Sequence, residues 1–276
     1  MENYLNGIEK SSCPFIVRLN NIMTTGIQMI KFDFTGRRAI VTGGTRGIGA
    51  AVTKALLEAG AAVTAIYASN DEAAKRFADE MGEYYTRLET VKFDVSDYAS
   101  VDAFFNDYDS RHDALDILVH CAGIRRDGVV AMLPKDSWES VISTDLGGTF
   151  NMFKLGVQRM LRKKYGRLIA ISSISGRIGI EGQGNYAAAK AGQVALVKSM
   201  AKEVAKRKIT VNCISPGFID TDFISSLPDE QRSAYIASVP SRRFGNADEV
   251  ATAAMFLASE EAAYITGTVL EVGGGL

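Results

Sequence analysis

The sequence predicts an α/β fold, a single doubly wound Rossmann-type domain with a parallel sheet flanked by helices on both faces. Three observations lead to this prediction. Short apolar runs alternate with helix-like segments along most of the chain. These runs are almost continuously apolar, which is typical of strands buried on both faces of a parallel sheet. A glycine-rich turn follows the first run, as in a dinucleotide-binding βαβ unit.

Each predicted element follows from its composition. Strands are expected in the aliphatic runs 38–41, 62–66, 90–93, 116–119, 168–171, 210–214 and 268–272. Helices are expected in the segments of helical composition 50–57, 73–81, 101–108, 138–161, 186–205 and 247–258. Right-handed crossovers between successive strands then give one sheet covered on both faces. No linker divides this region, so residues 32–276 are predicted to form one domain.

Residues 1–31 differ from the rest of the chain. They are polar and irregular, and they lack the basic start and apolar centre of a secretory signal. We expect a flexible extension, or a chain whose working start is Met23 or Met29. A packing arm that contributes to an oligomer contact is the alternative.

The overall composition excludes several classes of function. With 276 residues and a formal net charge of -1, the chain has no overall attraction for nucleic acid or an anionic membrane. No apolar run approaches the roughly 20 residues that span a bilayer. The three cysteines, Cys13, Cys121 and Cys213, suggest no disulfide framework, which predicts a reducing, cytoplasmic location. Because His112 and His120 have no metal-ligand spacing, no metal site is expected.

The glycine-rich turn is typical of a site for a dinucleotide pyrophosphate. Its spaced glycines permit a tight turn, a close approach of the backbone to the phosphates, and close helix–sheet packing. The following helix presents free N–H groups to an anion. No Lys-Ser/Thr pair follows, which excludes a Walker-type loop. The predicted phosphate-binding residues are Gly43, Thr45, Arg46, Gly47, Ile48 and Gly49. A tight turn without a ligand is the alternative.

The end of the second predicted strand favours NADP(H) over NAD(H). NAD sites usually have an acidic residue there to bind the ribose 2′-hydroxyl, whereas this strand is followed by Ser69 and Asn70, with no acid before Asp71. Ser69 and Asn70 can donate hydrogen bonds to a 2′-phosphate, and Arg46 can supply positive charge. Asp71 reads instead as the first residue of a helix.

Three residues suggest a site for carbonyl reduction. Tyr186 and Lys190 are four residues apart and therefore share one face of a helix. The ammonium favours the phenolate form of a neighbouring phenol, which can then act as a general acid toward a carbonyl oxygen. Ser173 ends a predicted strand segment, at the edge where open α/β sheets bind ligands. Its hydroxyl can orient the carbonyl.

These blocks together resemble the short-chain dehydrogenase/reductase family over the chain from about residue 32 to the C-terminus. Besides the glycine turn and Ser173, Tyr186 and Lys190, three further segments carry the resemblance. They are Asp94-Val95, Ala122-Gly123 and residues 216–221. It implies that Tyr186 and Lys190 touch the cofactor. It also implies cofactor contacts at Asp94, Val95, Cys121, Ala122, Gly123, Pro216, Gly217, Ile219 and Thr221.

Within the family, the segments 184–192, 216–222, 242–245 and 262–267 are very similar to bacterial 3-oxoacyl-(acyl carrier protein) reductases. This resemblance implies reduction of a 3-oxoacyl thioester by NADPH, in fatty-acid or polyketide-type biosynthesis, by a homotetramer. It also implies docking of the acidic carrier protein on Lys164 and Arg207. Both residues follow predicted helices, where cations are also favoured by the helix dipole.

Two departures from the family pattern keep other functions open. His120-Cys121 replaces the usual Asn-Asn before Ala122-Gly123, and Asp145 occupies the fourth catalytic position, where the family usually has Asn. An aspartate there can still bind water or pair with Lys190. One alternative is a reductase or dehydrogenase for another carbonyl or alcohol. The other is a weakly active or non-catalytic member of a hetero-oligomer.

Overall fold

The computed structural model describes residues 32–221 and 228–276. The predicted N-terminal extension, residues 1–31, lies outside the described residues. From Phe32 to Leu276 the chain forms one compact unit. No helix among the described residues combines the length and apolar character that crossing a bilayer requires.

A seven-stranded parallel sheet forms the centre of this unit, and its order is β3-β2-β1-β4-β5-β6-β7. The strands are β1 (Arg38–Thr42), β2 (Ala62–Tyr67), β3 (Leu88–Lys92), β4 (Ile117–His120), β5 (Gly166–Ile171), β6 (Ile209–Pro216) and β7 (Val269–Val272). Every predicted strand segment overlaps one of them. The strands β1, β4, β5 and β6 are buried almost throughout, as their continuous apolar runs predict. The predicted fold class is confirmed.

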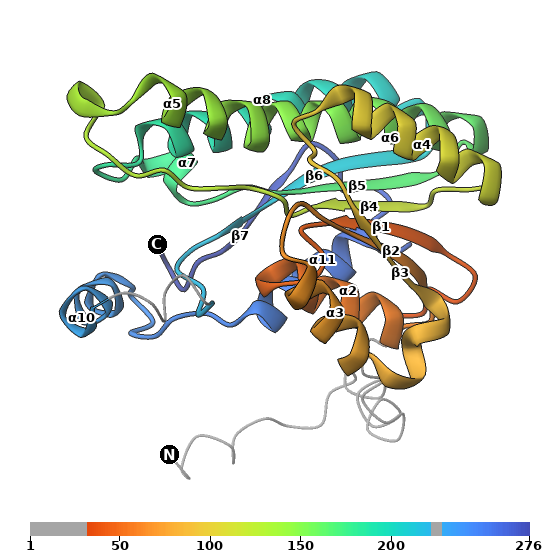
Figure 1. Cartoon of the computed structure of the whole chain (residues 1–276), viewed down its shortest axis with the longest axis horizontal. Coiled ribbons are helices and arrows are strands. Elements are labelled where there is room, and N and C mark those ends of the chain that lie inside the picture. The colour runs from red at the N-terminus through yellow and green to blue at the C-terminus, as the bar shows by residue number, and fades with distance from the viewer. Residues whose placement is uncertain (1–31, 222–227) are drawn as a thin grey trace, which may run out of the picture. The chain divides into compact units, whose positions relative to one another are not determined.

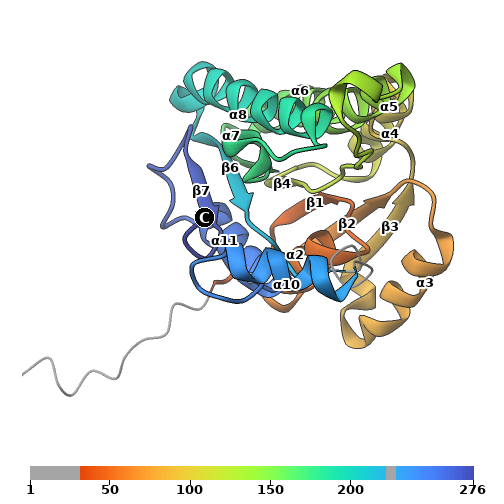
Figure 2. The same cartoon turned by 90° about the vertical axis from the view of Figure 1, so that its left-hand side faces the viewer.

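Helices cover both faces of the sheet (Figure 1). One face carries α2 (Gly47–Glu58), α3 (Asp71–Glu80) and α11 (Ala247–Ala258). The other carries α4 (Tyr98–Arg111), α5 (Lys135–Val141), α6 (Gly148–Lys163) and α8 (Gly184–Val204). Each layer packs its own apolar core against the sheet. Figure 2 shows the sheet between the two helical layers from the side.

Shorter elements complete the described chain. They are α7 (Ser175–Ile178), α10 (Asp229–Ser238) and the 3₁₀ turns η1 (Gly82–Arg87), η2 (Val130–Met132) and η4 (Ala205–Arg207). In Figure 1, α10 stands apart from the sheet. In the segment between Thr221 and Phe244, the apolar residues Phe223, Ile224 and Leu227 lie outside the described residues. In the described part, the ring of Tyr235 on α10 stacks on Phe218 at 4.6 Å.

The prediction of a single continuous α-helix over residues 138–161 is wrong in one respect, which is its continuity. A π-helical turn, η3 (Ile142–Gly147), separates α5 from α6. Such a turn places an extra residue in the helical path, and Asp145 lies in it, fully buried. Composition predicts helix here but cannot predict this change of pitch, because contacts with α8 stabilise it.

The order of the strands creates a binding edge. β1 and β4 are neighbours in the sheet. After β1 the chain continues to β2 on one side of this pair, and after β4 it continues to β5 on the other side. In open α/β sheets, ligands bind outside the carboxyl ends of the strands at such a switch point.

Candidate active site

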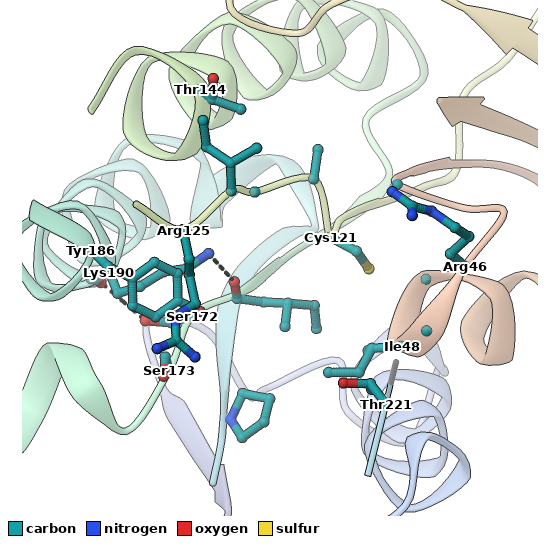
Figure 3. Close-up of a pocket in the computed structure, with 18 of the residues that line it drawn as sticks. Arg46, Ile48, Cys121, Arg125, Thr144, Ser172, Ser173, Tyr186, Lys190 and Thr221 are labelled. Carbon is teal, nitrogen blue, oxygen red and sulfur yellow. Dashed lines mark hydrogen bonds between the residues drawn. The ribbon is translucent and has the colours of Figure 1, made fainter. Parts of the chain in front are cut away.

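A cavity of about 570 Å³ lies at this edge. Its wall includes residues that follow the ends of β1 to β6. All the residues predicted to bind the cofactor line it, namely Gly43, Thr45, Arg46, Gly47, Ile48, Gly49, Ser69, Asn70, Asp94, Val95, Cys121, Ala122, Gly123, Tyr186, Lys190, Pro216, Gly217, Ile219 and Thr221. In Figure 3, Arg46 and Thr221 lie at one end, Ser173 and Tyr186 at the other, and Cys121 between them.

Two glycines of the turn, Gly43 and Gly49, have no room for a side chain. Gly43 has a positive φ of 62°, and a Cβ there would lie 3.2 Å from the backbone nitrogen of Ala122. A Cβ on Gly49 would lie 2.1 Å from the carbonyl oxygen of Gly43. No side chain caps the N-terminus of α2, and its first turn has no acidic residue. Its backbone N–H groups therefore suit a phosphate.

The end of β2 is compatible with a 2′-phosphate. Asn70 caps α3, because its side-chain oxygen accepts a hydrogen bond of 2.9 Å from the N–H of Ala73. Its amide nitrogen remains available to a ligand. The carboxylate of Asp71 pairs with Lys92 at 2.7 Å, which lowers the pKa of Asp71, and Asp71 is not part of the cavity wall. The carboxylate of Asp71 thus pairs with Lys92 and does not line the cavity.

Ser173 belongs to a short chain of hydrogen bonds. Its hydroxyl donates to Ser175 Oγ at 3.3 Å, and Ser175 in turn donates to Gln183 Oε1 at 2.9 Å. The N–H of Ser175 donates to Ser173 Oγ at 3.2 Å. β5 ends at Ile171, so Ser173 lies two residues beyond the strand rather than at its last residue. These contacts orient the Ser173 hydroxyl on the cavity wall.

Tyr186 and Lys190 lie one turn apart on α8, with Lys190 Nζ 5.3 Å from the centre of the Tyr186 ring. Lys190 is almost fully buried and donates to the carbonyl oxygen of Ile171 at 3.0 Å. The buried side chain of Asn185 joins the start of α8 to the loop after β4, since it donates to the Arg126 carbonyl at 2.9 Å. The phenol and the ammonium therefore share a rigid frame.

Asp145 lies behind the cavity wall rather than on it. Its Oδ2 is 3.3 Å from Lys190 Nζ, and its Oδ1 accepts a hydrogen bond of 2.8 Å from the N–H of Ile124. Burial raises the pKa of Asp145, and Lys190 opposes this shift. Burial also acts to lower the pKa of Lys190, but the charges of Tyr186 and Asp145 raise it overall. The predicted pairing of Asp145 with Lys190 is present in the structure.

His120 and Cys121, which replace the usual Asn-Asn of the family, fit into the structure as uncharged side chains. His120 is fully buried, with Nδ1 2.9 Å from the hydroxyl of Thr42. That hydroxyl oxygen also accepts hydrogen bonds from the N–H groups of Cys121 and Ala122. Burial lowers the pKa of His120 to about 3 and raises that of Cys121 to about 12, so both are neutral near pH 7. The backbone of this block still lines the cavity.

The sequence profile of a protein family described as Enoyl-(Acyl carrier protein) reductase matches residues 43–276. The chain belongs to the short-chain dehydrogenase/reductase family. This short-chain dehydrogenase/reductase is 42% identical to the 3-oxoacyl-(acyl carrier protein) reductase of Salmonella typhimurium over 244 residues, which are 88% of this chain and 98% of the relative. It is 43% identical to the enzyme of that name from Vibrio harveyi, with the same coverage. It is 38% identical to nodulation protein G of a Rhizobium species, over 89% of this chain and 98% of the relative. The protein is thus an oxidoreductase that resembles 3-oxoacyl-(acyl carrier protein) reductases.

The sequence did not point to several residues of the cavity wall in this short-chain dehydrogenase/reductase. Arg125 lies with its guanidinium 5.7 Å from the centre of the Tyr186 ring and pairs with Asp127. Gln183 holds Ser175, and it could have been noticed because it precedes Tyr186 by nearly one helical turn. No local pattern marks Arg125, because the fold of the loop after β4 brings it to the tyrosine.

The two predicted carrier-docking residues lie at the opposite edge of the sheet. Lys164 follows α6 and precedes β5, and Arg207 ends η4 and precedes β6. Both are exposed. The eight residues of β6 span about 26 Å at about 3.3 Å per residue. Within one chain, therefore, Lys164 and Arg207 lie far from the entrance of the cavity.

Proposed function

We propose that this protein uses NADPH to reduce a 3-oxoacyl thioester, carried by acyl carrier protein or coenzyme A, to the 3-hydroxyacyl form. The observation that carries the proposal is the position of Ser173, Tyr186 and Lys190 at one end of a cavity whose other end is the glycine turn. The relatives named for this reaction support the substrate class. We assign the protein to fatty-acid or polyketide-type biosynthesis in the cytoplasm.

The cavity fits a nicotinamide dinucleotide. The uncapped start of α2 and the close backbone approach at Gly43 and Gly49 suit a pyrophosphate. Arg46, Ser69 and Asn70 would hold a 2′-phosphate, which favours NADP(H). The adenine half and the central part of the cofactor would lie against two parts of the cavity wall, Asp94-Val95 and Cys121 to Gly123. When bound, the cofactor supplies a hydride to the carbonyl carbon of the substrate.

The roles of the three residues follow from their chemistry. Ser173 would donate a hydrogen bond to the carbonyl oxygen in place of its contact with Ser175. Tyr186 would donate the proton that completes the new hydroxyl group. Lys190 would bind the nicotinamide ribose and favour ionisation of Tyr186 as the proton leaves. Because the fold fixes these groups in advance, the reaction needs little reorganisation.

Docking of a carrier protein on Lys164 and Arg207 would require a second copy of the chain. Since both residues lie at the far edge of the sheet, they would serve the entrance of a neighbouring copy. This geometry is compatible with the homotetramer that we propose. A hetero-oligomer would satisfy the same requirement.

The test is oxidation of NADPH in the presence of a short 3-oxoacyl thioester, with coenzyme A and carrier-protein forms compared. We expect wild-type turnover, and Tyr186→Phe should abolish it without loss of NADPH binding. Tyr264→Phe is the matched control, because Tyr264 is fully exposed and outside the cavity. Retained turnover in Tyr186→Phe would contradict the assigned proton donor.

The second candidate is a reductase or dehydrogenase for another carbonyl or alcohol. The relative named nodulation protein G, whose name specifies no 3-oxoacyl substrate, favours keeping it. NADPH binding without turnover of any 3-oxoacyl thioester would select this candidate. If turnover appears only after addition of a co-purified partner chain, the protein is instead the non-catalytic subunit of a hetero-oligomer.

A further inference from the structure

The buried ion pair between Asp145 and Lys190 is a feature that carbonyl reduction does not by itself require. Asp145 is fully inaccessible and Lys190 is 3% exposed. Their closest atoms, Oδ2 and Nζ, are 3.3 Å apart. Asp145 Oδ2 has no aligned hydrogen bond among the described residues, so the contact is mainly electrostatic. A charge in this position acts directly on the ammonium that faces Tyr186.

The fold fixes Asp145 from several sides. The carbonyl oxygen of Asp145 accepts hydrogen bonds from Gln193 Nε2 at 3.0 Å and from the hydroxyl of Thr149 at 2.6 Å. Gln193 and Lys190 lie one turn apart on α8, so the same helix face holds both the backbone and the carboxylate of Asp145. A Cβ on Gly123 would lie 2.8 Å from Asp145 Oδ2. The carboxylate is therefore packed closely between Gly123 and Lys190.

The titratable groups of β4 and β6 around Lys190 are uncharged near neutral pH. Burial lowers the pKa of His120 to about 3. Burial raises the pKa of Cys121 and of Cys213 to about 12. All three feel the charge of Lys190. Asp145 is thus the acidic group in contact with the Lys190 ammonium among the described residues.

The other charges on elements packed against this site are engaged in their own ion pairs or point to solvent. Arg125 faces Tyr186 and pairs with Asp127. On these elements, Arg177 of α7 pairs with Glu271 and Lys135 of α5 pairs with Glu139. The other charged side chains of α5 and α8 are exposed, namely Asp136, Lys198, Lys202 and Glu203. None of these pairs includes Lys190. Lys190 and Arg125 are thus the cations that face the Tyr186 ring, and Asp145 is the carboxylate that contacts Lys190.

We infer that Asp145 is an ionised positioning residue, which fixes the Lys190 ammonium and offsets part of its charge at Tyr186. Burial raises the pKa of Asp145, whereas both contacts of the carboxylate, the ammonium and the N–H of Ile124, oppose that shift and favour the ionised form. The negative charge of the carboxylate opposes the field that the Lys190 ammonium exerts at the Tyr186 ring. The inference rests on the proposed function, in which Tyr186 is the proton donor.

Asp145→Asn tests this inference, because it removes the charge and nearly preserves the shape. In the reduction assay, the basic limb of the pH–rate profile should move to lower pH by about one unit. Asp248→Asn, a change of the same kind on an exposed residue at the start of α11, should leave the profile unchanged. A purely structural role for Asp145 would lower the rate without moving the limb. Profiles of Asp145→Asn and wild type that coincide in shape, or a shift to higher pH, would overturn the inference.

Two measurements need no substrate and so separate this inference from the proposed function. In the first, the tyrosinate absorbance of Tyr186 is identified as the part of the signal that is lost in Tyr186→Phe. This absorbance should appear at lower pH in Asp145→Asn than in wild type. The second measurement compares the infrared spectra of wild type and Asp145→Asn at neutral pH. The wild-type spectrum should contain no band of a protonated carboxyl group that is missing from the spectrum of Asp145→Asn. Such a band would mean that Asp145 is neutral, and it would overturn the inference even if the reductase activity were established. A wild-type spectrum at neutral pH that holds no protonated carboxyl band at all supports the inference by itself, so this outcome does not depend on the folding of Asp145→Asn.

Discussion

The burial of His120 leads to a specific prediction about how the free energy of unfolding depends on pH. Its imidazole is fully buried, its Nδ1 lies 2.9 Å from the Thr42 hydroxyl, and its Nε2 has no hydrogen-bond partner among the described residues. Protonation would place a cation in this apolar site, near Lys190. The native protein therefore keeps His120 neutral, with a pKa of about 3 set first by burial and then by Lys190. His120→Asn removes the titrating group and retains a polar side chain beside Thr42.

The sign and the size of the effect follow from linkage. An unfolded histidine has a pKa of about 6.5, so between about 6.5 and 3 the unfolded chain binds a proton that the native protein rejects. The contribution of His120 to the free energy of unfolding is intact above the unfolded pKa and falls as the pH falls toward 3. From pH 7 to pH 5 the expected loss is about 2 kcal/mol, and His120→Asn should be spared it.

Urea unfolding of wild type and His120→Asn at both pH values, at one protein concentration, measures this difference. Effects that do not depend on pH, such as the cavity left by the smaller side chain, cancel in the comparison. His112→Asn is the matched control, since burial also lowers the pKa of His112 but its side chain is partly exposed. Equal losses in wild type and His120→Asn would refute the reasoning, because they would mean that the native protein protonates His120 readily.

Four further changes test the site. Arg46→Ala should weaken NADPH binding by about tenfold or more and leave NADH binding unchanged in titrations that follow cofactor fluorescence; equal effects would exclude Arg46 as a 2′-phosphate ligand. Ser173→Ala should lower kcat by about 100-fold with NADPH affinity retained, and a rise in KM alone would argue against contact with the developing oxyanion. Gly123→Ala should keep a native circular dichroism spectrum yet lose turnover by about 100-fold, because its Cβ would push on the Asp145 carboxylate. Gln193→Met should lower the free energy of unfolding by about 1–3 kcal/mol in urea titrations, because it leaves the buried Asp145 carbonyl with one partner fewer; an unchanged stability would mean that the π-turn does not depend on α8.

The sequence was sufficient for features that depend on local spacing. Continuous apolar runs predicted the buried parallel strands, because a strand covered on both faces needs apolar residues throughout. The spaced glycines predicted the turn after β1. The four-residue spacing of Tyr186 and Lys190 predicted a shared face, because helical geometry fixes that relation without any other element. Ser173 was added from its place after a strand.

Tertiary structure decided the contacts between elements far apart in the sequence. The π-turn at Asp145 depends on Gln193 from α8, so helical composition alone could not reveal it. The pairing of Asp71 with Lys92 joins the start of α3 to the end of β3, which the sequence of either element alone does not reveal. Lys164, which we predicted to dock a carrier protein, lies at the far edge of the sheet, because strand direction separates the two ends of each strand. Periodicity and spacing describe each element on its own, whereas packing between elements determines which charges meet.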